Sequence, residues 1–312
     1  MVFALVLSGS CSNEQREKPQ RLTAEELRLK GMERTDSALA VTLAHAEGME
    51  GWMADSLARW QERLDALSAE AWVLVEDSTG LVISGKNADE RMYMASITKM
   101  MTCLLALENG RLEDSIVITK DVYTTSDARV KVGDGYTVGN MIREMMMLSD
   151  NNAAYALAKF VGGDTLTFYQ MMNEKARYLG MRGTHFANPN GMPNDSNYST
   201  ARDLLRLSRY CMRDPSFAEI VGTASADSPL LDGRHLPCRN TNALLEKYDG
   251  CIGIKTGFTR QAGNCLASAA TRDGVTLYLI LLKSKSYTSR FTESATLLDY
   301  GFEVMRVWRK YK

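Results

Sequence analysis

Histidine is scarce in this sequence, and the cysteines are scattered. The chain of 312 residues has three histidines, and they lie far apart at His45, His185 and His235. Its six cysteines include no C-x-x-C pair. Neither residue type has the spacing of zinc ligands. The histidines and cysteines therefore indicate no zinc site.

An excess of one charge and long apolar runs are also missing. The net charge is −1 at pH 7, with 45% hydrophobic and 24% charged residues, which is typical of a globular protein. Such a balance gives no general attraction to nucleic acid, so no nucleic-acid partner is expected. Beyond the N-terminus, no stretch approaches the ~20 apolar residues that span a membrane. We find no internal repeat and no low-complexity segment.

The N-terminus reads "MVFALVLSGSCSNEQREKPQ". An apolar run at residues 2–7, small residues leading to Cys11 and a polar stretch follow the order of a bacterial lipoprotein signal. No basic residue precedes the run, and the run is shorter than the ~7–15 residues of a typical signal, so a frayed start is the alternative. We expect residues 1–21 to be a lipoprotein-type signal and flexible segment. Lipidation of Cys11 would tether the protein on the periplasmic side of the cell envelope.

Helical signals fill residues 22–69. Thr23 and Glu26 have the spacing of a capping box. Apolar residues recur at helical spacing at Leu57, Trp60, Leu64 and Leu67. The sequence predicts a helical extension of two or three helices, which either packs on the domain that follows or acts as a stalk.

Residues 70–312 have strand signals at both ends and helical signals between them. "AWVLVEDSTGLVISGKN" predicts a hairpin at about 71–85, and "GCIGIKTGF", "NCLASAATR" and "GVTLYLILLKS" predict three further strands. The last two are joined by a turn that contains Asp273-Gly274. "SRFTESATLLDYGFEVMRVWRK" predicts a closing helix. We expect an α/β (α+β) fold, in which terminal helices flank a five-stranded antiparallel sheet and an all-helical lobe is inserted.

A serine and a lysine lie three apart in "MASITKMMTCLLALENG". On a helix this spacing places Ser96 and Lys99 on one face. Apolar neighbours would remove water from Lys99, which disfavours its charged form and makes it a possible base. S-x-x-K alone also occurs by chance, so this pair does not decide the function.

Two more motifs make chance implausible. "MLSDNNAAYALAKF" places Ser149, Asp150 and Asn151 before a helical run, and "GIKTGFT" places Lys255-Thr256-Gly257 on or just after a strand. This trio is the signature of the penicillin-recognising serine acyl transferases. The chain resembles the D-alanyl-D-alanine carboxypeptidase branch of that superfamily, the low-molecular-mass penicillin-binding proteins, over residues 70–305. The further stretches that carry the resemblance are "YTVGNMIREMMMLSDNNAAYALA", "HFANPNGMP", "YSTARDLLRLSRY", "GIKTGFTRQAGNCLASAATRDG" and "RFTESATLLDYGF".

The resemblance implies a serine hydrolase with a β-lactamase/transpeptidase-like fold. It would remove the terminal D-alanine from peptidoglycan stem peptides through an acyl-Ser96 intermediate, without metal or cofactor. β-Lactams would be covalent inhibitors. Lys99 would be the base, with its pKa lowered by burial and by a nearby Lys255. Ser149 would relay a proton to the leaving amine, and Asn151 would orient the substrate peptide bond.

The resemblance also implies how the substrate is bound. The backbone N–H groups of Ser96 and Phe258, the residue after Gly257, would form the oxyanion hole. Thr256 and Lys255 would hold the terminal carboxylate of the substrate. Arg290 matches an arginine to which the family assigns carboxylate binding, and the alternative is a solvated residue at a helix start.

Three alternatives keep the same fold. A class A β-lactamase often reads S-D-N, which Asp150 matches. It also needs a glutamate about 35 residues beyond Asn151, where "GTHFANPNGMP" contains no acidic residue, so we favour the carboxypeptidase. A DD-endopeptidase would use the same residues, and a catalytically inactive binding module would retain them. Met94 replaces a proline that is usual in the family.

The cysteines leave one question open. Cys103, on the helix of Ser96, is expected to be a small core residue. Cys238 and Cys251 can form a disulfide in an oxidising compartment, but the sequence does not decide whether they do.

Overall fold

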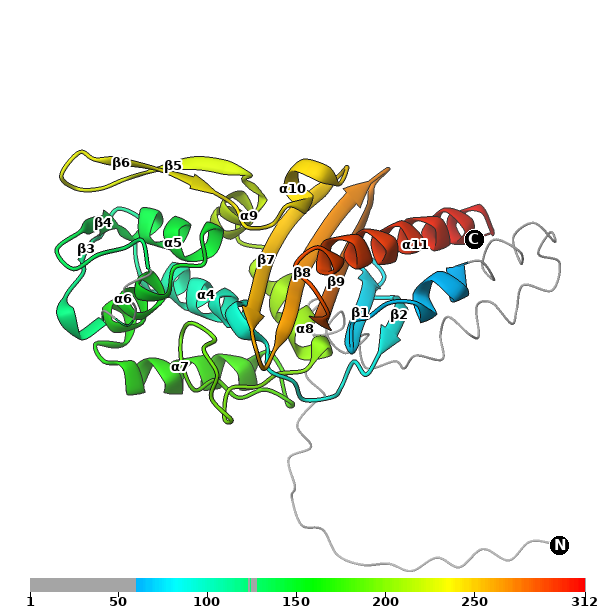
Figure 1. The fold of residues 1–312 in the computed structure, drawn as a ribbon, viewed down its shortest axis with the longest axis horizontal. Helices are drawn as coiled ribbons and strands as arrows, with labels where there is room; N and C mark the ends of the chain where they lie inside the picture. The colour runs from blue at the N-terminus through cyan, green and yellow to red at the C-terminus, as the bar shows by residue number, and fades with distance from the viewer. Residues whose placement is uncertain (1–59, 123, 125–127, 312) are drawn as a thin grey trace, which may run out of the picture.

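The computed structural model describes residues 60–122, 124 and 128–311. As predicted, an antiparallel sheet of five strands lies at its centre, in the order β2-β1-β9-β8-β7. Strands from both ends of the chain are neighbours, because β1 (Ala71–Glu76) pairs with β9 (Val275–Ser284). The other strands are β2 (Val82–Lys86), β7 (Cys251–Thr259) and β8 (Gly263–Arg272). Figure 1 shows the inserted lobe beside the sheet and the closing helix α11 (Ser289–Tyr311) crossing it.

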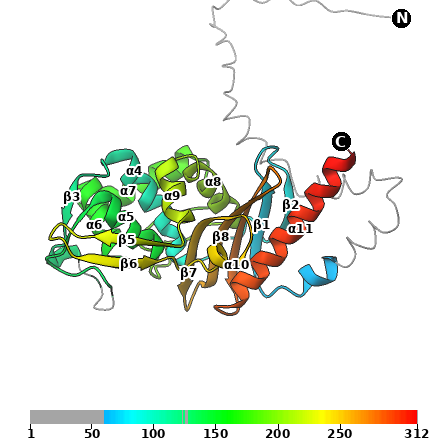
Figure 2. The same cartoon turned by 90° about the horizontal axis from the view of Figure 1, so that it is seen from above.

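Alternate residues of β1 enter two different hydrophobic cores. Ala71 and Val73 belong to the core shared with the lobe, whereas Trp72 and Leu74 belong to the core beneath α11. Successive side chains of a strand point to opposite faces of the sheet. A strand that is covered on both faces is therefore mostly apolar. Strand β1 is buried at every position and is apolar up to its last residue, Glu76. Figure 2 shows α11 on one face and the lobe helices towards the other.

The predicted turn closes the β8–β9 hairpin. Arg272 pairs with Val275, so Asp273 and Gly274 form a two-residue loop, with φ of 49° and 68°. Positive φ at both positions is typical of a type I′ turn, whose twist matches that of the strands it joins. The turn therefore fixes the register between β8 and β9.

The inserted lobe surrounds helix α4 (Lys99–Asn109), which continues directly from the short 3₁₀ helix η1 (Ala95–Thr98). Residues 99–106 of α4 are all buried. The helices around it are α5 (Val138–Met147), α6 (Asn151–Gly162), α7 (Thr165–Tyr178), α8 (Ala201–Cys211) and α9 (Pro215–Gly222). The short helix α10 (Leu244–Lys247) leads into β7.

The prediction of an all-helical lobe needs a correction. The lobe also carries two small antiparallel sheets, β3 (Ser115–Val117) with β4 (Gly135–Thr137) and β5 (Ser225–Pro229) with β6 (His235–Arg239), and the 3₁₀ turn η2 (Lys120–Val122). Three residues are too few to show an alternating pattern. The β5 sequence SADSP is mostly polar and ends in proline, which weakens its strand signal.

Residues 60–69 pack on the domain. Residues 60–65 are helical, the Trp60 ring centroid lies 5.7 Å from that of Tyr300, and Leu64 is buried in the core beneath α11. The Ser68 backbone N–H donates to Glu293 Oε1 at 2.8 Å. Residues 60–69 therefore pack on the domain and do not form a stalk. Cys11, the Thr23–Glu26 pair and Leu57 lie outside the described residues.

The described cysteines are free thiols. Cys103 is buried in the core, as predicted. Cys238 donates to Glu144 Oε1 and Cys251 to the Gly253 carbonyl, each at 3.4 Å, so these two thiols do not form a disulfide in this structure.

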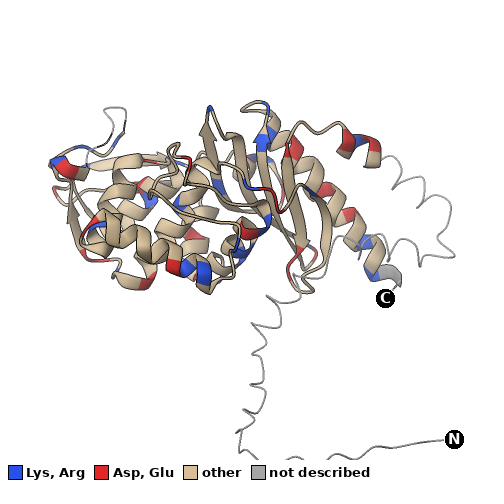
Figure 3. Cartoon of the chain, turned by 90° about the horizontal axis from the view of Figure 1, so that it is seen from below, with Lys and Arg blue, Asp and Glu red and all other residues tan. Residues whose placement is uncertain are grey.

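The described part of the chain contains no group of histidine, cysteine and acidic side chains suited to a metal ion. None of its helices combines the length and the apolar character needed to cross a membrane. Charges of both signs are intermixed over the face shown in Figure 3, in keeping with the net charge of −1.

We expect Leu64→Ala to lower the free energy of unfolding by about 2–4 kcal/mol, because it leaves a cavity in the core beneath α11. Gln61→Ala, at an exposed position of the same helix, should change it by less than about 0.5 kcal/mol. Urea unfolding followed by circular dichroism measures both. Equal stabilities would show that this segment does not contribute to the domain.

Candidate active site

Ser96 lies in an open cleft between the lobe and the edge strand β7. It is the second residue of η1, so Ser96 and Lys99 lie one turn apart on a continuous helix. The cleft has a volume of about 530 Å³. Its lining residues come from η1, the turn before α6, the segment between β6 and α10, strands β7 and β8, and the segment around the start of α11. They are Ser96, Ser149, Thr241, Thr256, Gly257, Phe258, Asn264, Lys285, Ser286, Tyr287 and Arg290.

Two non-glycine residues next to the cleft have left-handed backbones. Ala95, directly before Ser96, has φ of 48°, and Ser149 has φ of 66°. Such conformations are sterically unfavourable for residues with a Cβ atom, and they persist only where the surrounding structure imposes them. The backbone at both serines is therefore held in place by its neighbours.

Lys99 is completely buried behind Ser96. Its Nζ donates to Ser96 Oγ at 2.9 Å, to Asn151 Oδ1 at 2.9 Å and to the Asn190 carbonyl oxygen at 2.6 Å. Burial lowers the pKa of Lys99 to about 7, although the nearby Asp150 carboxylate acts in the opposite direction. Near neutral pH a substantial fraction of Lys99 is therefore uncharged and able to accept a proton.

The three partners of Lys99 also determine the direction of its lone pair. A neutral amine has two N–H donors and one lone pair, and carbonyl oxygens can only accept hydrogen bonds. Asn151 Oδ1 and the Asn190 carbonyl therefore take the two N–H groups. The lone pair is left facing the Ser96 hydroxyl, which is the one partner that can donate. This arrangement suits proton transfer from Ser96 to Lys99.

The S-D-N motif forms the turn that starts α6. Ser149 faces the cleft, and Asn151, the first residue of α6, contacts Lys99. Asp150 lies between them and is buried as the N-cap of α6, where its carboxylate accepts from the backbone N–H groups of Ala153, Arg129 and Val130. These bonds satisfy both carboxylate oxygens. Asp150 therefore holds the turn together rather than facing the cleft.

Lys255 lies on β7 and is buried, with its Nζ donating to the Thr256 carbonyl at 3.0 Å. Its pKa is lowered well below the usual range, first by burial and then by repulsion from Lys99 and Arg290. The sequence argument gave Lys255 a share in lowering the pKa of Lys99. In the structure burial is the main cause that lowers the pKa of Lys99, and repulsion between the two amines adds to the effect of burial on the pKa of Lys255.

Two glycines allow backbone segments to approach Ser96 closely. A Cβ atom at Gly257 would lie 3.0 Å from the Met94 carbonyl oxygen and 3.1 Å from the Ser96 nitrogen. A Cβ atom at Gly191 would lie 1.9 Å from the Ala95 carbonyl oxygen. Strand β7 and the loop containing Gly191 therefore both pack directly on the backbone at Ser96. This contact brings the chain at Phe258, the residue after Gly257, to the cleft.

Arg290, in the first turn of α11, is also part of the cleft wall. Its side chain is 4% exposed, and one Nη donates to the Gly257 carbonyl at 3.2 Å. The guanidinium lies over the rings of Tyr287 and Phe291, 4.5 and 4.8 Å from their centroids. The alternative of a solvated helix-start residue is wrong. Its buried Nε has no hydrogen-bond partner among the described residues.

Several residues of the site were missed by the sequence analysis. Thr241 shares a hydrogen bond of 2.6 Å with Thr256 between their hydroxyls, and Lys285 and Tyr287 line the cleft. The contact of the Asn190 carbonyl, in the loop "FANPNGMP", with Lys99 was also missed. A backbone acceptor gives no residue-type signal, since every residue carries a carbonyl group.

Comparison with known proteins identifies the family. A family model described as D-alanyl-D-alanine carboxypeptidase matches residues 58–286. The chain belongs to the D-alanyl-D-alanine carboxypeptidase family.

Members of this family from several bacteria resemble the chain. It is 30% identical to D-alanyl-D-alanine carboxypeptidase DacF of Bacillus subtilis, over 79% of this chain and 65% of that protein, which is less than two thirds of the relative. It is 34% identical to DacB2 of Mycobacterium tuberculosis, over 75% of this chain and 82% of that protein. The crystal structure of the Streptomyces K15 DD-transpeptidase matches 76% of this chain and 98% of its own, with a TM-score of 0.73 and 33% identity.

Two observations fit the carboxypeptidase family better than a class A β-lactamase. None of the residues that line the cleft is acidic. The loop at residues 186–193 instead brings the Asn190 carbonyl to Lys99. Asp150, which matches the S-D-N of many β-lactamases, is occupied as the cap of α6.

The pKa of Lys99 can be measured directly. In protein labelled at lysine Cε with ¹³C, we expect the Lys99 resonance, assigned with Lys99→Met, to titrate with a midpoint of about 7. The Lys99→Met spectrum, which lacks this resonance, is the control. A midpoint near the ordinary lysine value of about 10.4 would contradict the assignment of Lys99 as a base near neutral pH.

Proposed function

We propose that this chain is a serine-type D-alanyl-D-alanine carboxypeptidase, which removes the terminal D-alanine from peptidoglycan stem peptides. The observation that carries this proposal is the buried Lys99 amine, whose Nζ lies 2.9 Å from Ser96 Oγ at an open cleft. Family membership supports the choice of substrate. β-Lactams would acylate the same serine, because they present a strained amide to the same nucleophile.

In the first half of the reaction, Lys99 takes the proton from Ser96 and Oγ attacks the carbonyl carbon of the penultimate residue. The new O–C bond produces a tetrahedral intermediate with a negative oxygen. Backbone N–H groups of Ser96 and Phe258 would stabilise that oxygen. The close packing of Gly257 on the Ser96 backbone supports this pairing.

In the second half, the C–N bond breaks as the leaving amine receives a proton by way of Ser149, and D-alanine departs. Asn151 would orient the scissile peptide through its side-chain amide. Water then attacks the acyl-Ser96 ester, with Lys99 again taking a proton. The stem peptide leaves with a new carboxylate, and Ser96 regains its hydroxyl group.

The terminal carboxylate of the substrate would bind to Thr256, Lys255 and Arg290. The cleft is lined by two cations and no carboxylate, which favours an anionic substrate. An arriving carboxylate also favours the protonated form of Lys255. Binding of the substrate would therefore stabilise the charged form of Lys255, which burial alone disfavours.

Experiments can distinguish the proposed function from three other activities and from an inactive module. A DD-endopeptidase would use the same residues on cross-linked peptides. A transpeptidase, the activity named for the similar Streptomyces structure, would pass the acyl group to an amine instead of water. A class A-like β-lactamase would lose its penicillin adduct rapidly, and an inactive binding module would form none.

We also propose that the protein works in the cell envelope. Removal of D-alanine from stem peptides takes place where peptidoglycan is built, which is outside the cytoplasm. Lipidation of Cys11, at the end of a segment of residues 1–21 with the order of a lipoprotein signal, would hold the domain on the periplasmic side. The helical extension would then connect the tether to the domain.

Intact mass spectrometry with benzylpenicillin tests the nucleophile. We expect one adduct with the mass of the drug on the wild type, lasting for minutes, and none on Ser96→Ala. D-Alanine release from a peptide ending in D-alanyl-D-alanine should disappear in the same variant. Rapid loss of the adduct with steady hydrolysis of the drug would indicate the β-lactamase instead, and no adduct would indicate the inactive module.

Arg290→Gln tests carboxylate binding. We expect the second-order rate constant of acylation by benzylpenicillin to fall roughly ten- to a hundredfold, because a charge-assisted hydrogen bond contributes about 1.5–3 kcal/mol. Acylation by the methyl ester of benzylpenicillin, which lacks the carboxylate, should change much less. Arg260→Gln, an exposed arginine outside the cleft lining, is the control. Equal losses with the acid and the ester would rule out carboxylate binding by Arg290.

A further inference from the structure

One loop, residues 185–198, provides the third partner of Lys99. Besides the Asn190 carbonyl, the Pro189 carbonyl accepts from Thr102 Oγ1 at 2.6 Å. Gly191 packs on the backbone at Ala95. These contacts join the tip of the loop to the helix that carries Ser96 and Lys99.

The tip of the loop is also held by its own side chains. Asn188 Oδ1 accepts from the Gly191 N–H at 2.7 Å, and its Nδ2 donates to the Met192 carbonyl at 2.9 Å. Asn190 Oδ1 accepts from the Met192 N–H at 3.0 Å. These bonds fix the conformation of the tip. The direction of the Asn190 carbonyl therefore depends on how the whole loop is attached to the rest of the domain.

The loop is attached at a neck where its two ends meet. His185 and Tyr198 exchange backbone hydrogen bonds of 2.9 and 3.0 Å. One residue outside this pair, the hydroxyls of Thr184 and Ser199 lie 2.7 Å apart. Ser199 in turn exchanges backbone hydrogen bonds with Met92, four residues before Ser96. The neck therefore lies against the chain that leads to the nucleophile.

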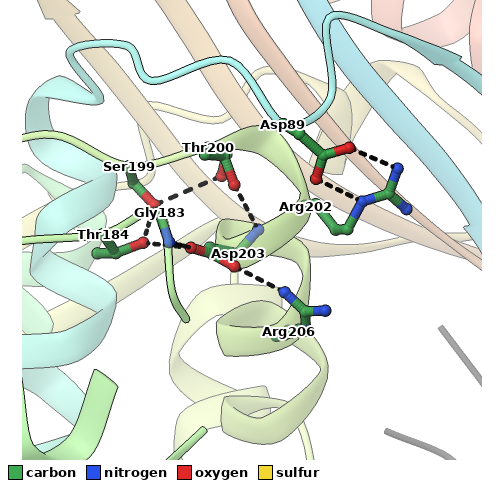
Figure 4. Close-up of polar contacts among 8 residues, drawn as sticks. All are labelled: Asp89, Gly183, Thr184, Ser199, Thr200, Arg202, Asp203 and Arg206. Atoms are coloured by element: carbon green, nitrogen blue, oxygen red, sulfur yellow. Dashed lines mark hydrogen bonds and ion pairs between the residues drawn. The ribbon is translucent and has the colours of Figure 1, made fainter. Parts of the chain in front are cut away.

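A single buried carboxylate fastens this neck to α8. Asp203 Oδ2 accepts from the Gly183 N–H at 2.7 Å and from Thr184 Oγ1 at 2.8 Å, while Oδ1 accepts from Arg206 at 2.7 Å. Figure 4 shows these contacts converging on Asp203 from the loop neck and from α8. Asp203 is 3% exposed. A buried carboxylate is costly unless it is fully hydrogen-bonded, so these bonds define one position for the neck.

We propose that Asp203 is a positioning residue for the acylation of Ser96: it fastens the neck of loop 185–198, and the loop directs the Asn190 carbonyl at the Lys99 amine. This inference rests on the proposed function. It deepens that function, because it makes the orientation of the Lys99 amine depend on Asp203, a carboxylate outside the cleft lining.

Loss of the clamp has a defined chemical consequence. If the Asn190 carbonyl moves away, one N–H of Lys99 has no fixed acceptor and the lone pair is no longer held towards Ser96. Water admitted beside the amine favours its protonated form. The charged groups that act on Lys99 in the structure are Asp150 and, through mutual repulsion, Lys255. His185, the histidine at the neck of the loop, is unchanged in every variant below.

The same helix offers a matched control. Asp89 pairs with Arg202 of α8 at 2.7 and 3.0 Å, as Figure 4 shows. Its side chain is 69% exposed, and within the described residues it forms no hydrogen bond to the loop. Asp89→Ala removes an aspartate–arginine pair and leaves the neck intact. Arg206→Ala removes the ion pair of Asp203 and leaves its two bonds to the neck.

The experiment measures the second-order rate constant of acylation by benzylpenicillin from pH 5 to 9, with intact mass also giving the fraction of protein acylated at completion. For Asp203→Ala we expect a loss on the order of 10²-fold at neutral pH, the effect of misplacing a catalytic group. We also expect the acid limb of the profile to move to higher pH. Asp89→Ala and Arg206→Ala should stay within about threefold of the wild type, without a shift of the limb.

A purely structural role gives a different result. It would reduce the fraction acylated at completion and the melting temperature, while the folded molecules kept the wild-type rate and acid limb. That result would overturn the proposal. If Asp203→Ala does not fold, Thr184→Val removes one bond of the clamp and should shift the limb in the same direction by less, and an unshifted limb there would equally overturn it.

Acylation and D-alanine release by the wild-type protein test the proposed function separately from the role of Asp203. Acylation without release of D-alanine from the peptide would reject the carboxypeptidase activity, and the comparison of Asp203→Ala with Asp89→Ala would still stand. Absence of acylation in the wild type would overturn both proposals.

Discussion

The burial of one amine is the constraint on which the site depends. Lys99 has no contact with solvent, and a charged ammonium at such a position would be strongly disfavoured. The neutral form needs two acceptors, which come from α6 and from loop 185–198, and the remaining direction points to Ser96. Three segments that are far apart in sequence must therefore meet at Nζ. The arrangement of the lobe around α4 can be understood as the means of bringing them there.

Preorganisation extends from this amine to the backbone. Ala95 and Ser149 adopt left-handed conformations, while Gly257 and Gly191 admit the neighbouring chains without a Cβ atom. Unfavourable backbone geometry of this kind is tolerated where the surroundings over-determine it. Here the surroundings are the core of the lobe and the sheet. The stability of the domain is thus partly used to hold two serines at one cleft.

Much of the fold was predictable because its signals are local. The Asp273-Gly274 turn, the apolar strands β8 and β9, and the closing helix all have short-range patterns, and the three motifs pointed to Ser96, Lys99, Ser149, Asn151 and Lys255. Other features depend on tertiary contacts. The Asn190 carbonyl has no side-chain signature, the burial of Arg290 depends on Tyr287 and Phe291, and the strands of three residues in the lobe are too short to show a pattern.

The pairing of β1 with β9 has a consequence for biogenesis. Ala71 is opposite Leu282, so the central sheet is built from the two ends of the described chain, and such non-local pairings form slowly. One wall of the cleft, with β7 and Arg290, is also made after the entire lobe. A ribosome must therefore finish nearly the whole chain before Ser96 faces a complete cleft. Partly synthesised molecules would carry the serine and its lysine without a complete cleft to bind substrate.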